Sequence, residues 1–184
     1  LLTGQDDRLP LAGMIDTVRA AAEEAETAFD VKGAHLGGNG SDRLIADRAG
    51  SILDGGLGDD VLTGGIGDDL LIGGMGADVL TGGEGNDVFL FTPASFGNGG
   101  AGIDGITDFA PGDRIDLSTL SSIVPGGGLS FIGAKAFGGH AGEVQVYDDN
   151  RNTFVAGDLD GDGTADFVIQ IDGHHQLGSG DLLL

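Results

Sequence analysis

The chain has 184 residues, of which 30 are acidic and only 8 are Lys or Arg, so its formal net charge is −22. This charge repels nucleic acid and anionic membrane surfaces and attracts cations. Cysteine is absent, which excludes disulfides and thiolate metal sites, and the chain contains no run of 18 apolar residues that could span a membrane.

Residues 1–36 are predicted to form a helical cap or a linker to a missing upstream domain. Pro10 suits the first position of a helix, and apolar residues then recur at steps of three and four as far as Phe29. This pattern predicts a short N-terminal helix from about residue 10 to 29. The helix either covers one end of the next element or is the tail of the upstream domain. Its apolar stripe consists of Leu11, Met14, Ile15, Val18, Ala22, Ala25 and Phe29.

A nine-residue repeat occupies residues 37–91. Six blocks follow each other in register, and five of them begin Gly-Gly-x-Gly-x-Asp and carry Leu or Phe at the eighth place. The block at 46–54 keeps Leu53 but has Ser51 where the Asp belongs. A fixed internal period of this kind predicts a solenoid. The acidic positions are Asp42, Asp60, Asp69, Asp78 and Asp87.

The first six residues of each block predict a tight turn that binds a hard cation. Glycine permits positive φ angles and close backbone approach, so the turn can aim several carbonyl oxygens at one point. The Asp adds a charged oxygen, and an all-oxygen site of irregular geometry suits Ca²⁺ better than Mg²⁺ or Zn²⁺. Besides the five Asp residues, the predicted metal-binding positions in the repeats are Gly56, Gly58, Gly65, Gly67, Gly74 and Gly76.

Two blocks are needed to close one coil of about 18 residues, because each block supplies one short strand and one turn. Odd and even blocks then stack on opposite sides of the coil. A cation between neighbouring turns of one side would take an Asp from each, and Ser51 would weaken the site that it shares with Asp69. The interior is predicted to contain Leu44, Leu53, Leu62, Leu71, Leu80 and Phe89.

After Phe91 the period is expected to stop, and residues 92–184 are predicted to form an antiparallel sheet or sandwich. Alternating apolar runs at 143–147, 153–157 and 166–171 are typical of strands with one buried face. In the last run, Phe167, Ile169 and Ile171 share that face. The predicted fold is therefore all-β, with a right-handed parallel β-roll followed by an antiparallel region.

The segment 158–166, "DLDGDGTAD", is a second candidate for calcium binding. Its alternate acids and its turn glycine resemble the first nine places of an EF-hand-like loop, although Ile169 stands where that loop ends in Glu. A polar hairpin turn between two strands is the alternative interpretation. The candidate ligands are Asp158, Asp160, Asp162 and Asp166.

The repeat closely resembles the calcium-binding nonapeptide of RTX proteins. Four further segments, "NDVFLF", "DGITDFAPGDRIDLS", "FGGHAGEVQV" and "ADFVIQIDG", resemble the C-terminal module of serralysin-type bacterial metalloproteases and other type I secretion substrates. The resemblance covers about 37–184. It implies an extracellular calcium module, a final calcium held by Asp104 and Asp113, and an export signal in the tail "DLLL" (181–184).

No catalytic constellation is found in the sequence. The signature H-E-x-x-H is absent, and His35, His140, His174 and His175 are interpreted as surface or loop residues. We therefore expect a non-enzymatic calcium-binding module of a secreted bacterial protein that folds after type I secretion and stabilises an upstream domain. The alternatives are a polysaccharide-binding accessory module, as on alginate epimerases, and an adhesin fragment. The expected partners are calcium ions, the secretion machinery and the upstream domain.

Overall fold

The computed structural model describes residues 29–31, 34–46, 50–96 and 102–184. Within them the fold is all-β, as predicted, with a single 3₁₀ helix, η1 (Ser118–Ser122), and two sheets. The seven-stranded sheet has the order β1 (Phe29–Val31), β2 (Ala34–Asn39), β4 (Ile52–Leu57), β6 (Leu70–Met75), β8 (Val88–Leu90), β10 (Arg114–Asp116), β15 (Leu182–Leu183). The eight-stranded sheet has the order β11 (Ser130–Gly133), β12 (Glu143–Asp148), β13 (Asn152–Asp158), β14 (Phe167–Asp172), β9 (Asp104–Ile106), β7 (Val79–Glu84), β5 (Val61–Ile66), β3 (Arg43–Ile45).

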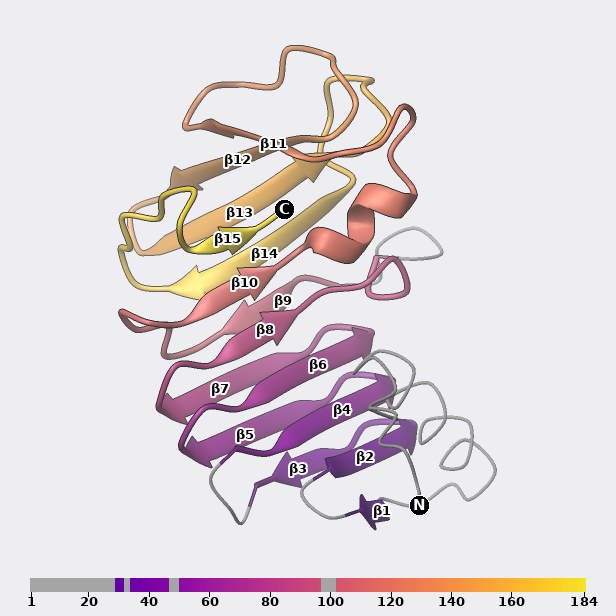
Figure 1. The fold of residues 1–184 in the computed structure, drawn as a ribbon, viewed down its shortest axis with the longest axis vertical. Helices are drawn as coiled ribbons and strands as arrows, with labels where there is room; N and C mark the ends of the chain where they lie inside the picture. The colour runs from indigo at the N-terminus through magenta and orange to yellow at the C-terminus, as the bar shows by residue number, and fades with distance from the viewer. Residues whose placement is uncertain (1–28, 32–33, 47–49, 97–101) are drawn as a thin grey trace, which may run out of the picture.

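Successive strands of the repeats alternate between the two sheets, which produces the predicted roll (Figure 1). Each strand pairs in parallel with the strand that starts 18 residues later, so that Leu53 lies beside Leu71 and Leu62 beside Leu80. These leucines are fully buried between the sheets. The eighth place of each block therefore forms the thin interior, because strand side chains alternate between the two faces.

The roll does not end at Phe91, contrary to the sequence-based expectation. Strand β9 pairs in parallel with β7, and β10 pairs in parallel with β8. Asp104 and Asp113 are nine residues apart and occupy the Asp place, and Ile106 and Ile115 follow in the place of the inward Leu. The offset from the preceding turn is 26 residues instead of 18, as between Asp78 and Asp104, so an insertion interrupts the period without ending the coil.

The antiparallel region is an extension of one sheet of the roll. Strands β12, β13 and β14 pair antiparallel, and β14 joins the roll through a parallel pairing with β9. The predicted face of the last run is confirmed, because Phe167, Ile169 and Ile171 are buried. On the other sheet, the C-terminal strand β15 pairs in parallel with β10 and buries Leu182.

Most of the predicted N-terminal helix, residues 10–28, lies outside the described residues. Phe29, the last residue of its apolar stripe, instead begins strand β1, which pairs antiparallel with β2. In the described ranges, no helix has the length and apolar character needed to cross a bilayer.

Candidate metal centre

The turns of the roll depend on glycine at the second and fourth places of each block. Gly56 and Gly58 have φ angles of 96° and 116°, and Gly74 and Gly76 on the next turn have 104° and 139°. Residues with a Cβ rarely adopt these angles. The carbonyl oxygens of Gly56 and Gly58 also lie so close to Gly74 and Gly76 that a Cβ there would collide with them.

The even side of the roll repeats this arrangement, with the carbonyl oxygens of Gly65 and Gly67 against Gly83 and Gly85. Four of the six predicted glycines therefore place a carbonyl oxygen between two turns. The corresponding contacts of the Gly74 and Gly76 carbonyl groups are not among those of the described residues.

The first glycine of each block faces the carboxylate of its own block. A Cβ on Gly64 would lie 2.6 Å from Oδ2 of Asp69 and 2.5 Å from the carbonyl oxygen of Gly82 on the next turn. The same two kinds of oxygen converge over Gly55, where they come from Asp60 and Gly73. The missing side chain therefore leaves a space lined by one carboxylate oxygen and one carbonyl oxygen.

The acidic residues form two columns along the roll, one on each side. In each column, Oδ1 of an Asp accepts the backbone N–H of the residue at the same place one turn earlier, for example Asp60 from Asp42 at 2.7 Å. The first column contains Asp42, Asp60, Asp78 and Asp104, and the second contains Ser51, Asp69, Asp87 and Asp113.

In the column acids of the nine-residue blocks, the second carboxylate oxygen has no hydrogen-bond partner among the described residues. Oδ2 is buried and accepts no hydrogen bond from the described part of the chain in five of the repeat acids. Buried polar atoms are hydrogen-bonded in the great majority of cases, so a set of identical exceptions needs an explanation. The five acids are Asp42, Asp60, Asp69, Asp78 and Asp87.

Burial makes four of these carboxylates, together with Asp104, hard to ionise when no cation is present. Loss of solvation raises the pKa of Asp60 and Asp104 from 3.8 to about 7, and the pKa of Asp78 and Asp87 to about 6. The pKa of Asp69 is raised for the same reason. The hydrogen bond from the backbone of Asp42 lowers the pKa of Asp60, and neighbouring carboxylates such as Asp78 raise it, but burial has the largest effect.

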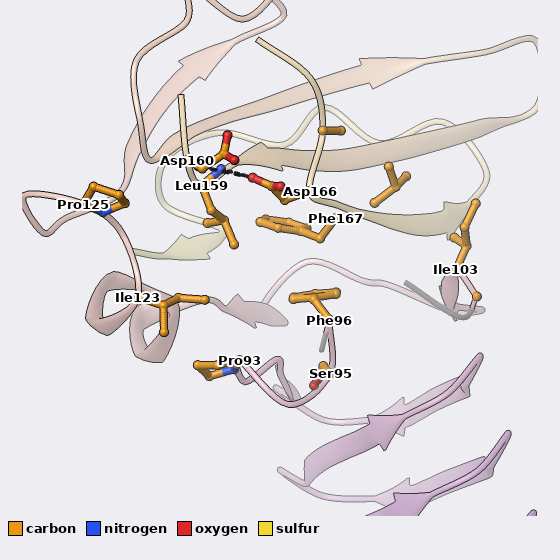
Figure 2. A pocket seen from close by; sticks show the side chains of 13 residues that line it. Pro93, Ser95, Phe96, Ile103, Ile123, Pro125, Leu159, Asp160, Asp166 and Phe167 are labelled. Carbon is orange, nitrogen blue, oxygen red and sulfur yellow. Dashed lines mark hydrogen bonds between the residues drawn. The ribbon is translucent and has the colours of Figure 1, made fainter. Parts of the chain in front are cut away.

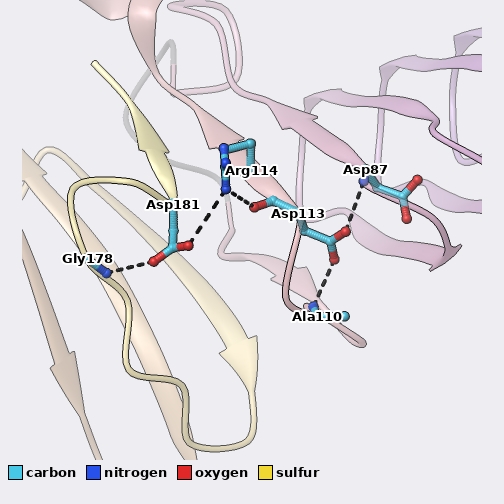
Figure 3. A network of polar contacts seen from close by, with 6 residues as sticks. All are labelled: Asp87, Ala110, Asp113, Arg114, Gly178 and Asp181. Carbon is cyan, nitrogen blue, oxygen red and sulfur yellow. Dashed lines mark hydrogen bonds and ion pairs between the residues drawn. The ribbon is translucent and has the colours of Figure 1, made fainter.

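The resemblance implies a final calcium held by Asp104 and Asp113. In the structure, Asp104 is the last acid of the first column and Asp113 is the last acid of the second. Asp113 uses both carboxylate oxygens, accepting from the backbone N–H of Asp87 at 2.9 Å and of Ala110 at 2.8 Å (Figure 3). It therefore closes the second column at the end of the roll. Figure 3 also shows Arg114, whose Nη1 donates to the carbonyl oxygen of Asp113 and lies 3.8 Å from Oδ1 of Asp181.

Asp108 is a site residue that the sequence analysis missed. Its carboxylate accepts the backbone N–H groups of Gly82 and Gly83 at 2.9 and 2.8 Å. It stands five residues before Asp113, at the place of the first glycine in a repeat block. That spacing is the signal that could have identified it.

The loop at 158–166 connects β13 and β14 and brings three of its four acids together. Oxygens of Asp158, Asp160 and Asp166 all lie within 4.8 Å of one another. Asp158 is buried and accepts from the backbone of Gly161 and Gly163. The carboxylate of Asp162 instead accepts from the backbone N–H of Thr164 at 2.7 Å and is not part of the group.

Asp160 and Asp166 also line a cavity of about 740 Å³ (Figure 2). Oδ2 of Asp166 accepts from the backbone N–H of Leu159 at 2.6 Å. Two aromatic side chains line the same cavity, Phe96 and Phe167, and their rings stack with centroids 4.6 Å apart.

The histidines lie away from these acidic groups, except for His35. His140 is exposed beside Glu143, and His175 contacts the carbonyl oxygen of Asp172 through Nε2 at 2.9 Å. His35 lies in strand β2, beside the inward Leu53, instead of in a loop. Among the described residues, no histidine is part of a group that could hold a metal ion.

Comparison with known proteins places the chain in a family. The family model described as peptidase M10 serralysin C terminal matches residues 31–184. A search of curated protein sequences found no match.

Solved structures that are similar in fold include two subunits of one epimerase and a lipase. The AlgE6R3 subunit of the mannuronan C5-epimerase from Azotobacter vinelandii is 33% identical with a TM-score of 0.56, over 79% of this chain and 78% of that chain. The AlgE6R2 subunit of the same enzyme is 33% identical with a TM-score of 0.56, over 80% and 90%. The extracellular lipase LipA from Serratia marcescens is 22% identical with a TM-score of 0.59, over 85% of this chain and 21% of the lipase, which supports the fold alone.

Proposed function

The chain belongs to the family of serralysin C-terminal domains of M10 peptidases, and on this premise we propose that it is a calcium-binding RTX module of a secreted bacterial protein. Its role is to fold when it meets calcium outside the cell and to stabilise the domain that precedes it. The observation that carries the proposal is the set of five buried Oδ2 atoms that no group in the described part of the chain hydrogen-bonds.

The donor set favours calcium over other common metal ions. The groups nearest to Gly37, Gly55 and Gly64 are carboxylate and backbone carbonyl oxygens, with no thiolate and no imidazole. Calcium accepts six to eight such oxygens at irregular angles, whereas magnesium requires near-octahedral geometry and zinc prefers nitrogen or sulfur. Oxygens contributed by two successive turns therefore suit calcium.

We assign the ions of the roll to the gaps between successive turns of one side. The acids of two turns and the glycine carbonyls between them would be the ligands, and Ser51 leaves the start of the second column with one carboxylate fewer. Asp113 is the last acid of the second column, so its part is to end the column. The proposed ligands are Asp42, Asp60, Asp69, Asp78, Asp87 and Asp104 with the carbonyl groups of Gly56, Gly58, Gly65, Gly67, Gly74 and Gly76.

The same geometry explains why folding would depend on calcium. Without a cation, carboxylates about 5 Å apart repel each other by about 1 kcal/mol even in a water-like dielectric. Ordering the glycine-rich turns costs a further ~1–2 kcal/mol per residue, which the thin leucine interior offsets only in part. A bound Ca²⁺ neutralises this charge and cross-links two turns, so that its binding free energy becomes folding free energy.

Calcium levels would then set where the chain folds. Extracellular calcium modules have dissociation constants of about 10⁻⁴–10⁻³ M. The roll would stay open during passage through a type I secretion machine and close outside the cell. The tail from Asp181 to Leu184 is the proposed export signal.

We propose one further ion in the loop at 158–166, held by Asp158, Asp160 and Asp166. The support is the convergence of three carboxylates within 4.8 Å. Asp162 is not a ligand in this arrangement, because it is not a member of this converging group.

Circular dichroism and calorimetry on the whole chain test the central proposal. The expected result is little β-structure in excess chelator, β-structure at millimolar calcium (about 10⁻³ M) and little response to the same concentration of magnesium. A roll that is equally folded and equally heat-stable in excess chelator would refute the mechanism.

The similarity to two subunits of a mannuronan C5-epimerase favours a second candidate, an accessory module that binds polysaccharide for an attached enzyme. The net charge of −22 opposes binding of a polyanion such as alginate. Titration with alginate and with a neutral glycan, in calcium, separates the two candidates, because a pure folding module binds neither.

A further inference from the structure

The two sheets of the roll differ on their outer faces. On the eight-stranded sheet no ninth-place residue of the blocks is fully buried: Ile45 is 52% exposed, and Thr63 and Thr81 are half-buried. On the seven-stranded sheet the same place carries Leu36, Asp54 and Ile72, which are 4%, 2% and 2% exposed. We call these three residues the outer row.

The outer row is not part of the interior of the roll. Its members pair across β2, β4 and β6 and alternate with the inward Leu53 and Leu71. Strand side chains alternate between faces, so the outer row points away from the leucine column. Leu36 and Ile72 are accordingly buried without belonging to the core cluster that contains those leucines.

The rest of this face is also apolar. Ile52, Leu70 and Val88 occupy the adjacent outward positions of β4, β6 and β8, and Leu90 follows the outer row on β8. All four are only partly exposed. A sheet of this kind, with apolar residues on both faces, is typical of a layer that is covered on both sides.

We propose that the N-terminal segment covers this face, with the apolar stripe of residues 10–29 packed across β2, β4, β6 and β8. The first described strand, β1, is the edge strand of the seven-stranded sheet and pairs with β2, so the 28 residues before it are joined to the sheet that carries this face. A 20-residue helix is about 30 Å long, which exceeds the roughly 14 Å between the first and fourth of four adjacent strands.

The composition of the segment fits this position. Its stripe supplies apolar residues every three or four positions, as a helix lying on a sheet requires. The segment is therefore a third layer of the module, and any domain upstream of it is joined to the roll through this layer.

The test uses the full chain, folded in calcium, which has no Trp and no Cys of its own. Leu70→Trp places an indole on the outer face of the seven-stranded sheet. Val79→Trp places one at the matching seventh place of a block on the other sheet, where the native side chain is 41% exposed. We expect acrylamide to quench the indole at position 79 freely and the indole at position 70 poorly.

A charge in the apolar stripe should uncover position 70. Val18→Asp is expected to raise quenching at position 70 severalfold and to leave position 79 unchanged. Thr17→Asp, which adds the same charge at a neighbouring polar position, should change neither. Unchanged quenching at position 70 in the Val18→Asp chain would overturn the proposal. Shielding at position 70 that disappears on dilution would also overturn it, because a second copy of the chain would then be the cover.

Cross-linking gives a second measurement that does not depend on the indole variants. Leu70→Cys, at the half-buried outward position of β6, is combined in turn with Met14→Cys, Val18→Cys or Ala22→Cys and treated with a short bismaleimide. At least one stripe position should cross-link within a single chain, and the control Thr17→Cys should not. Failure of all three stripe positions, or equal yield with the control, would contradict the assignment of this segment to this face.

Discussion

The backbone N–H of Asp60 donates a hydrogen bond to Oδ1 of Asp78, 2.8 Å away and 18 residues further along the chain. The other oxygen of Asp78 is buried and has no hydrogen-bond partner in the described structure. Each column acid in the repeats therefore has two separate roles. One oxygen fixes the register of two turns, and the other is available to a cation.

Replacing Asp60 by Asn separates these roles. The amide oxygen can still accept from Asp42, and the amide nitrogen can donate to the carbonyl oxygen of Gly73, which lies in the same space. We expect Asp60→Asn to remove calcium capacity and to weaken folding in calcium. In chelator the variant should be more stable than the parent, by on the order of 1 kcal/mol, because a buried unpaired charge is gone.

The matched control for this change is Asp59→Asn. Asp59 is the neighbouring residue and its Oδ1 also accepts an N–H from the next turn, that of Ala77, but on the exposed surface. Calorimetry and urea unfolding, each with and without calcium, give the comparison. An equal loss of calcium capacity in both variants would mean that the buried column is not the metal site.

Ser51 offers the opposite experiment, a gain of function. Ser51 is buried at the Asp place of the second column, and its backbone N–H donates to Oδ1 of Asp69 at 2.6 Å. Ser51→Asp should add calcium capacity or affinity, because it supplies the missing carboxylate between two turns. Ser51→Asn has the same size without the charge and should add much less. Identical calorimetric titrations of parent and Ser51→Asp would count against ions held between stacked turns.

The raised pKa values predict how the calcium-free roll responds to pH. The pKa values of Asp60 and Asp104 are about 7 in the folded chain, against 3.8 ordinarily, so the folded state binds these protons more tightly than the unfolded state. Their contribution to the free energy of unfolding is fully present below the ordinary pKa and is lost as the pH rises through 6 to 7. In chelator, β-structure should therefore increase between about pH 8 and about pH 5.

Calcium should reverse this dependence, because protons and calcium compete for the same carboxylates. Calcium affinity is expected to fall as the pH is lowered through the same window. Urea unfolding at a series of pH values, with and without chelator, checks both signs. A calcium-free chain whose β-structure decreases steadily toward acid pH would show that these carboxylates are ionised in the folded state.

Much of the roll can be predicted from the sequence, because its period fixes the structure directly. Nine residues contain one turn and one strand, so the inward place of Leu62 and the column neighbours of Asp60 follow from counting. The continuation through Asp104 and Asp113 does not follow from counting across the insertion. Only their own spacing of nine, together with Ile106 and Ile115, indicates that the roll resumes.

Other features depend on contacts that no local pattern contains. The first glycine of a block is needed because Oδ2 of the Asp five residues later occupies the place of its Cβ, as at Gly64 and Asp69. Asp108 holds Gly82 and Gly83 from 25 or 26 residues away. In the loop at 158–166, the sequence spacing predicts Asp162 as a calcium ligand like Asp160. In the structure, its carboxylate accepts a hydrogen bond from the backbone N–H of Thr164.

That difference in the loop provides a matched pair of variants. Asp160 belongs to the group of three converging acids and Asp162 does not, although both are exposed and two residues apart. Asp160→Asn should remove one calcium ion from the total and leave folding of the roll in calcium unchanged. Asp162→Asn should leave the number of ions unchanged. If both variants bind as many ions as the parent, the loop is a polar hairpin turn without a metal.

The C-terminal tail combines a structural and a proposed export role, and the two can be separated residue by residue. Leu182 is 4% exposed and pairs with Ile115 of β10, whereas Leu183 is 41% exposed on the same short strand. Leu182→Ala should lower the free energy of unfolding by about 2–4 kcal/mol, as truncation of a buried leucine does. Leu183→Ser removes little buried surface, so folding in calcium should be nearly unchanged.

A secretion machine that recognises the tail before the chain folds does not distinguish Leu182 from Leu183 by burial. If the tail is the export signal, Leu183→Ser should reduce the amount of chain in the culture medium although the purified variant folds normally. Tyr147→Ser, which changes a side chain of similar exposure (39%) far from the tail in sequence, is the control and should be exported like the parent. Secretion of Leu183→Ser at the level of the parent and of this control would exclude the exposed tail leucine from recognition.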